Sequence, residues 1–538
     1  MQFPRSLAGC ALATITCLLL ASCGGSAAGS TSATQKPQTT GATNPGRVTA
    51  TPGADTRAPA ATSAPAAAAV TAAPAAAATA APAADTSAGV VEAPPVTVNP
   101  YTSTSEDNRS TFAMDVDTAS YTSARSYLEN SQLPPAEAVR VEEFVNYFRY
   151  EYPSPDEFAF GVSIDSAPSP FGLDATQLVR IGVQGQRVDA SQRPNAMLTF
   201  VIDISGSMQV PDRLPLAVES LRVLLDELRE GDQIGIVAYG STARVLLEHT
   251  DVTNRQVILQ ALQGLGDGGS TDVEGGLRLG YELANSAYNP AGINRVILCS
   301  DGVANVGPTG PDAILETIRA AAQQNIYLTT VGFGMGGYND YMMEQLADDG
   351  NGNYAYVDTL AAARRIFVES LSGTLQVIAR DAKIQVEFDP AVVESYRLLG
   401  YENREVADVD FRNNAVDAGE VGAGHSVTAL YELRVKPIEG TALTVRLRYQ
   451  NPTGPDVVEL EQAYSTTQFG QDFASASPRL QLAVGAAAFA EQLRGSVYAR
   501  DRSLAAIRLI ADRIAPQLAD DTDVQEFAQL VARAEALR

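Results

Sequence analysis

Several oxygen-bearing side chains stand directly after an apolar run at residues 197–202. The run is typical of a strand buried on both faces, and it is followed by Asp203, Ser205 and Ser207. At the carboxyl end of a parallel strand, side chains face the crevice in which open α/β sheets bind ligands. One carboxylate and two hydroxyls are hard oxygen donors of the kind that Mg²⁺ prefers. The stretch therefore predicts a divalent-cation site.

Two later stretches add oxygen donors to this set. Residues 265–274, LGDGGSTDVE, place Thr271 in a glycine-rich loop before a helical pattern. Residues 295–302, RVILCSDG, are a second buried-strand pattern, which ends in Asp301. In the alternative interpretation, these residues only cap ordinary strand-to-helix turns. We favour the cation site because the three pieces occur in order, each at the end of a predicted strand.

The elements that must position these residues alternate along the chain. Predicted strands lie at residues 197–202, 234–239, 244–247, 296–299, 326–333 and 352–357. Predicted helices lie at residues 214–228, 254–265, 273–288, 312–323, 341–346 and 360–371. Such alternation requires a parallel sheet covered by helices on both faces. We therefore expect an α/β fold, a Rossmann-like, doubly wound and mostly parallel sheet, over residues 195–375.

The three motif pieces resemble the metal-ion-dependent adhesion site (MIDAS) of von Willebrand factor type A (vWA) domains. TFAMDVDTASYTSARSYL, PPAEAVRVEEFVNYFRYEYP and GFGMGGYNDYMMEQLADDGNGNYAYVDTL extend the likeness. With them, the chain resembles bacterial lipoproteins of the vWA domain family that have an N-terminal vWA-associated segment and a C-terminal domain of unknown function.

This resemblance implies a metal site formed by residues that are all present: Asp203, Ser205, Ser207, Thr271 and Asp301. It implies Mg²⁺, or another divalent cation such as Mn²⁺ or Ca²⁺, as the bound ion. It also implies a protein ligand whose Asp or Glu carboxylate fills an open position on the metal. The biological role of the family does not follow from the resemblance.

The remaining body of the chain divides by pattern into four segments. We expect a helical N-terminal segment at 108–152, strands at 153–194, a β-sandwich at 376–470 and helices at 471–538. The strands at 153–194 are too few for a stable sheet alone. We therefore hypothesise that they complete the later sandwich, with the vWA domain inserted into it.

The N-terminal residues predict a targeting segment. Residues 1–22 combine Arg5 with an apolar stretch of about 14 residues, too short to span a bilayer and typical of a signal peptide. The sequence around Cys23 resembles a bacterial lipobox, which implies that this thiol carries a lipid. An ordinary secretory signal is the alternative. Residues 23–107, rich in Ala, Thr, Pro and Ser, predict a disordered linker. We thus expect a lipid-anchored, extracytoplasmic protein of the cell envelope.

Composition excludes several classes of function. The 538 residues contain 38 Lys and Arg against 63 Asp and Glu, a net charge of −25, which argues against nucleic-acid binding. Only 2 His are present, so catalysis based on histidine has little material. Among the 4 Cys, Cys299 is alone in the folded body and is predicted to be an inert core thiol.

These observations favour a binding or adhesion protein rather than an enzyme. One alternative is an envelope assembly or structural lipoprotein with a vestigial metal site, and another is a metal-dependent hydrolase. Asp115-Val116-Asp117-Thr118 superficially matches a phosphatase nucleophile motif. The long buried strand that this motif needs does not precede it, so we interpret it as a capped helix start.

Overall fold

The computed structural model describes residues 97–538 except 172–175, 190, 192, 267, 303–310, 335–339, 370–374, 417, 453, 455 and 501. The predicted signal peptide, Cys23 and most of the predicted linker lie outside the described residues. All described residues belong to one compact unit. No helix in this described part combines the length and the apolar character needed to cross a membrane.

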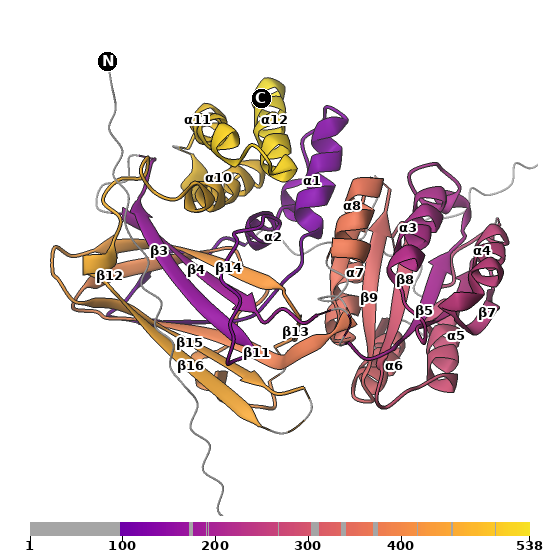
Figure 1. The fold of residues 1–538 in the computed structure, drawn as a ribbon. Helices are drawn as coiled ribbons and strands as arrows, with labels where there is room; N and C mark the ends of the chain where they lie inside the picture. Colours follow the sequence, from indigo (N-terminus) through magenta and orange to yellow (C-terminus); the bar gives the residue numbers. More distant parts are fainter. Residues whose placement is uncertain are drawn as a thin grey trace, which may run out of the picture. The chain divides into compact units, whose positions relative to one another are not determined.

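A six-stranded sheet forms the centre of the α/β domain, in the order β10-β9-β8-β5-β6-β7 (Figure 1). Its strands are β5 (Ala196–Asp203), β6 (Gln233–Tyr239), β7 (Ala243–Asp251), β8 (Ile293–Ser300), β9 (Ile326–Phe333) and β10 (Tyr354–Val357). All neighbouring pairs are parallel except β6 and β7, where the edge strand runs antiparallel.

Helices cover both faces of this sheet. They are α3 (Leu214–Glu227), α4 (Arg255–Gln263), α5 (Val273–Ser286), α6 (Pro311–Ala322), α7 (Asp340–Asp349) and α8 (Leu360–Arg364). Side chains alternate across a strand, so Phe200 packs into the core beneath α3, α4 and α8, and Val201 packs into the opposite core. The predicted doubly wound α/β fold is confirmed.

Two further sheets form a β-sandwich from strands on both sides of the α/β domain. One contains β1 (Thr102–Ser103), β12 (Val393–Leu399), β14 (Ser426–Val435), β4 (Thr176–Gly185) and β3 (Phe160–Pro168). The other contains β13 (Glu420–Gly422), β11 (Val377–Phe388), β15 (Thr441–Gln450), β16 (Val457–Ser465) and β2 (Arg109–Ala113). β4 pairs with β14 from Gln184↔Ser426 to Thr176↔Arg434, and one core joins both sheets. The α/β domain is therefore inserted into the sandwich, as hypothesised.

The N-terminal part of this sandwich differs from the prediction. Residues 97–107 were assigned to the disordered linker, yet β1 pairs with β12, and the Asn99 side chain donates to the carbonyls of Leu398 and Gly400. The segment predicted as helical contains β2, which pairs with β11. Both strands are short, and their pairing partners lie almost three hundred residues away, so local periodicity does not reveal them.

Five helices cluster beside the sandwich: α1 (Ala119–Glu129), α2 (Val141–Asn146), α10 (Pro478–Leu493), α11 (Leu504–Ile514) and α12 (Thr522–Leu537). Within the segment predicted to be helical, residues 136–148 do not form one continuous helix. A short 3-10 turn, Ala136–Ala138, is separated from α2 by Val139 and an extended Arg140. The Ser120 hydroxyl donates to the Ala138 carbonyl at 2.7 Å and accepts from the Arg140 amide at 2.9 Å, which holds this break.

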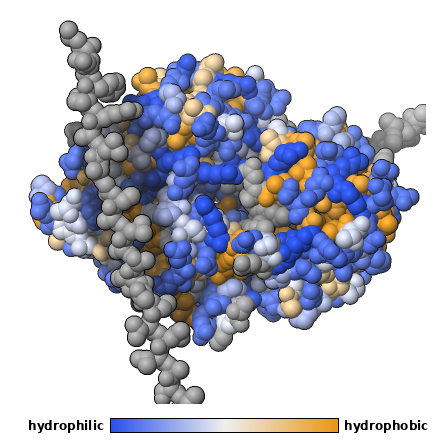
Figure 2. Space-filling view, viewed as in Figure 1, coloured by the Kyte–Doolittle hydropathy of each residue, from blue (hydrophilic) through white to orange (hydrophobic). Residues whose placement is uncertain are grey.

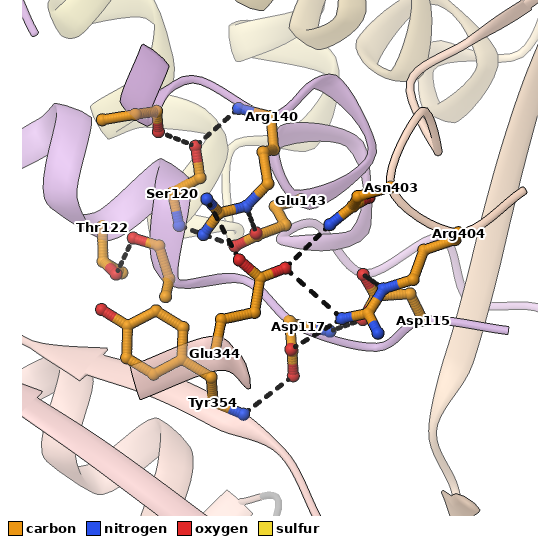
Figure 3. A network of polar contacts seen from close by, with 12 residues as sticks. Asp115, Asp117, Ser120, Thr122, Arg140, Glu143, Glu344, Tyr354, Asn403 and Arg404 are labelled. Carbon is orange, nitrogen blue, oxygen red and sulfur yellow. Dashed lines mark hydrogen bonds and ion pairs between the residues drawn. The ribbon is translucent and has the colours of Figure 1, made fainter. Parts of the chain in front are cut away.

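An ionic network joins the α/β domain to the N-terminal segment and to the sandwich (Figure 3). Arg404, after β12, pairs with Asp115 at 3.1 Å and with two carboxylates of α7, Glu344 at 3.4 Å and Asp348 at 2.8 Å. Asp117 accepts the Tyr354 amide of β10 at 3.0 Å. The apparent phosphatase motif thus belongs to an interdomain joint, which we call the Arg404 joint.

The face of the molecule drawn in Figure 2 is largely hydrophilic, with groups of hydrophobic residues between the hydrophilic ones. Among the described residues, the most exposed large hydrophobic side chains are Val409, Leu509 and Val497, which lie on different elements.

Candidate metal centre

The predicted site residues lie at the carboxyl ends of two adjacent parallel strands. Asp203 is the last residue of β5, and the turn after it carries Ser205 and Ser207. Asp301 directly follows β8. Because β5 and β8 pair in parallel from Ala196↔Ile293 to Ile202↔Cys299, their ends meet at one edge of the sheet. This shared edge is what brings residues 203–207 to residue 301.

Hydroxyl and carboxylate oxygens form a continuous row at this edge. The Ser205 and Ser207 hydroxyl oxygens are 3.0 Å apart, and the Ser207 hydroxyl donates to Asp301 Oδ1 at 3.1 Å. Adjacent ligands of an octahedral Mg²⁺, each at roughly 2.0–2.1 Å from the ion, lie about 2.9 Å apart. The spacing of the row therefore fits the neighbouring positions of one small, hard cation.

Asp203 lies beneath this row and orients it. Its side chain is fully buried; Oδ1 accepts the Ser205 amide at 2.8 Å and Oδ2 accepts the Ser300 hydroxyl at 2.8 Å. The Tyr239 hydroxyl lies 3.4 Å from the same Oδ2. Burial raises the pKa of Asp203, while the hydrogen bonds from Ser205 and Ser300 oppose the rise. Asp203 thus fixes the backbone that presents the two serine hydroxyls.

The loop that carries Thr271 packs on the same turn. The Gly206 amide donates to the Gly269 carbonyl at 2.9 Å, and the Gly268 amide donates to the Ile204 carbonyl at 2.8 Å. Asp272 then caps α5 by accepting the Gly275 amide at 3.0 Å. Among the described contacts, the Thr271 hydroxyl makes no hydrogen bond to the side chains of the other four candidate ligands. Its role as a ligand therefore stays a prediction.

Two residues of the site were missed in the sequence. Ser300 holds Asp203, and Arg213, immediately before α3, pairs with Asp301 Oδ2. The polar Ser300 inside a buried-strand pattern was a signal for the first. Nothing local marks Arg213, because its partner is 88 positions away.

The donor set fits a hard divalent cation and not a soft one. Among the described residues, no group of three or more His, Cys, Asp and Glu is placed to hold a metal ion. The candidate centre depends instead on hydroxyl oxygens beside two carboxylates, which suit Mg²⁺, Mn²⁺ or Ca²⁺.

The thiol and the imidazoles make no described contact with the row of oxygens. Cys299 is buried, and burial raises the pKa of its thiol to about 12. Burial lowers the pKa of His249 to about 4, and its Nε2 lies 2.9 Å from the Thr199 hydroxyl. His425 lies immediately before β14, where burial and then Arg295 lower its pKa to about 4. Cys299 is a buried core residue, as the sequence predicts, and its inertness stays a prediction.

Comparisons with known proteins find similarity along most of the chain. A family described as "von Willebrand factor type A domain" matches residues 198–369, and one described as "von Willebrand factor" matches residues 93–180. A third, "Uncharacterized protein YfbK, C-terminal", matches residues 373–442 and 436–537.

Two relatives and one solved structure illustrate the similarity. "Uncharacterized protein YfbK" of Escherichia coli (strain K12) is 34% identical over 471 residues, which cover 82% of this chain and 80% of that protein. "Uncharacterized protein sll0103" of Synechocystis is 26% identical and covers 51% of this chain and 66% of its own. A "von Willebrand factor type A from Catenulispora acidiphila" superimposes with a TM-score of 0.42 and 17% identity, covering 71% and 91% of the two chains.

Proposed function

Because this chain belongs to the YfbK family of von Willebrand factor type A proteins, we propose that it captures a protein ligand through a divalent cation. The residues proposed to hold the cation are Asp203, Ser205, Ser207, Thr271 and Asp301. When bound, Mg²⁺ or a similar hard cation supplies an electrophilic position that accepts a carboxylate oxygen. An Asp or Glu of the ligand contributes that oxygen.

The row of Ser205, Ser207 and Asp301 oxygens, spaced 3.0 and 3.1 Å apart, carries this proposal. Asp203 holds the Ser205 amide, so both hydroxyls face the same side as Asp301. The hydroxyls are neutral, so they add no negative charge that would repel an anionic ligand. An anionic ligand is favoured for that reason, and the scattered exposed apolar side chains agree with recognition by charge.

Binding without catalysis is the second element of the proposal. A hydrolase of this kind requires a general base within hydrogen-bond reach of the reacting water. His249 contacts Thr199, four residues before Asp203, which is about 13 Å along an extended strand. His425 lies in the sandwich. Neither imidazole contacts a candidate ligand in the described contacts, which supports a binding role.

The N-terminus supports a location at the cell envelope. We infer that Cys23 carries a lipid anchor, which the Ala-, Thr-, Pro- and Ser-rich segment after it connects to the described body. Labelling with a lipid precursor tests this inference. Incorporation that is lost in Cys23→Ser supports it, and labelling of that variant overturns it.

Affinity capture from native envelope extract tests the ligand. The immobilised full chain is compared with Asp301→Asn in Mg²⁺ and in EDTA. Asp226→Asn is the matched control, since Asp226 also pairs with an arginine, Arg255, but is exposed. We expect one protein that is retained by the wild type and the control, released by EDTA and not retained by Asp301→Asn. Retention that is the same in Mg²⁺ and in EDTA, and the same for the wild type and Asp301→Asn, would overturn the proposal.

A further inference from the structure

Arg213 contacts the candidate metal centre at two points. Its Nη1 donates to the Ser207 carbonyl at 2.9 Å and pairs with Asp301 Oδ2. The other oxygen of Asp301 accepts the Ser207 hydroxyl. One carboxylate thus stands between the serine row and a guanidinium, so Arg213 is part of the electrostatics of the site.

Gly334, which has no Cβ, leaves room for the Arg213 side chain. Gly334 follows β9 with a φ of +79°, and a Cβ at this position would lie 2.3 Å from Arg213 Nε and 2.4 Å from Arg213 Cγ. The Arg213 side chain is 19% exposed and that of Asp301 is 8% exposed. The guanidinium is therefore packed between the end of β9 and Asp301, and is not a freely moving surface group.

The net charge of the metal-loaded site indicates how Arg213 affects binding. Asp203 and Asp301 carry two negative charges, which a divalent cation would balance to zero. With the Arg213 guanidinium included, the loaded site carries a net charge of +1. A fixed positive charge beside the site repels the cation and attracts an anion that approaches it.

We propose that Arg213 determines specificity at this centre by weakening the hold on the divalent cation and strengthening the capture of a carboxylate ligand. This inference rests on the proposed function, and it adds a residue that acts on the ligand through charge. It predicts that the two affinities respond in opposite directions when the guanidinium is removed.

Water proton relaxation with Mn²⁺ measures both affinities on the full chain. Bound Mn²⁺ enhances relaxation, and acetate that displaces its coordinated water reduces the enhancement. For Arg213→Gln we expect Mn²⁺ to bind on the order of tenfold more tightly and acetate on the order of tenfold more weakly. For Arg213→Lys, which keeps the charge, we expect both values to stay near those of the wild type.

Arg222→Gln is the matched control, since Arg222 lies on α3 and pairs only with the exposed Glu219 in the described contacts. It leaves both affinities unchanged. Unchanged or weaker Mn²⁺ binding by folded Arg213→Gln overturns the inference alone. If Arg213→Gln does not fold, the lysine variant decides, and tighter Mn²⁺ binding by Arg213→Lys overturns it. A wild type that binds no Mn²⁺ overturns the proposed function as well.

Discussion

The Ser207 hydroxyl donates to Asp301 Oδ1 at 3.1 Å across 94 positions of sequence. This bond ties the turn after β5 to the end of β8, its parallel neighbour. Ser207 is exposed, whereas Asp203 beneath it is fully buried. The site therefore separates residues that face a ligand from the residue that holds them in place.

Asp203→Ala is expected to destabilise the protein, and Ser207→Ala is not. The first removes the acceptor of the Ser205 amide and of the Ser300 hydroxyl, a loss of about 1–3 kcal/mol for buried groups. The second changes an exposed residue and is expected to stay within about 0.5 kcal/mol. Urea unfolding in EDTA measures both. Equal stability of the two variants would contradict the positioning role of Asp203.

Arg404→Met is expected to weaken the Arg404 joint. The buried carboxylates of Asp115 and Glu344 lose their shared guanidinium, and removing one partner of a buried ion pair costs about 3–5 kcal/mol. Urea unfolding gives the loss, and amide exchange locates it at α7. Arg412→Met is the control, since the Arg412–Glu459 pair is exposed and contributes less than about 1 kcal/mol. Similar losses in both variants would refute a structural role for the joint.

Stability is expected to fall as the pH rises above neutrality. Burial, the leading cause, raises the pKa of Glu142 to about 7 and that of Glu143 to about 8. A carboxyl whose pKa is higher in the folded state stabilises the fold at low pH, and this contribution is lost as the pH rises through the folded value. His249 and His425, whose pKa values are lowered to about 4, act oppositely but only below about pH 6.5.

The free energy of unfolding is therefore expected to fall between pH 6.5 and 8.5, on the order of 1 kcal/mol. Urea unfolding at several pH values measures the slope, and Glu143→Gln is expected to flatten it. A slope of the opposite sign, or one that Glu143→Gln leaves unchanged, would show that these carboxyls are not the source.

Gly182→Ala is expected to disturb the packing between the sandwich and the segment before β3. A Cβ at Gly182 would lie 2.1 Å from Tyr152 Cζ, while the Tyr152 hydroxyl is fixed 3.0 Å from that of Thr428. Overpacking of this kind costs about 1–3 kcal/mol. Gly266→Ala is the control, because a Cβ there would meet no atom of the described residues within 4 Å. Thermal unfolding compares them, and equal melting temperatures would contradict the prediction.

Continuous apolar runs and alternating apolar and polar residues made the α/β domain and the sandwich predictable. Buried runs such as 197–202 and alternating runs such as 443–449 report burial directly. The edge strand β16 shows the same alternation, since Val458 and Leu460 pack on the sandwich core while Glu459 and Glu461 pair with arginines. The helix predicted at 360–371 instead ends as α8 at Arg364 and continues as a π turn at Arg365–Glu369.

Four of the candidate ligands, Asp203, Ser205, Ser207 and Asp301, were found in the sequence because they follow strand patterns, whereas Thr271 lies in a loop between α4 and α5. Arg213 and Arg404 were not found, since an ion pair leaves no mark on the residues around it. Their partners lie 88 and 289 positions away. The linker boundary failed for the same reason, because β1 becomes a strand only through its pairing with β12.

Calorimetric titration of Mg²⁺ into the full chain, freed of metal with EDTA, tests the central claim most directly. We expect the wild type to bind one Mg²⁺ per chain, and Ser207→Ala to lose at least about tenfold in affinity, since one of the oxygens proposed to bind the ion is removed while the fold is retained. Ser286→Ala, an exposed serine at the end of α5, is the control and is expected to bind as the wild type does. No heat from the wild type, or the same Mg²⁺ affinity in Ser207→Ala, would contradict the claim that these oxygens hold a divalent cation.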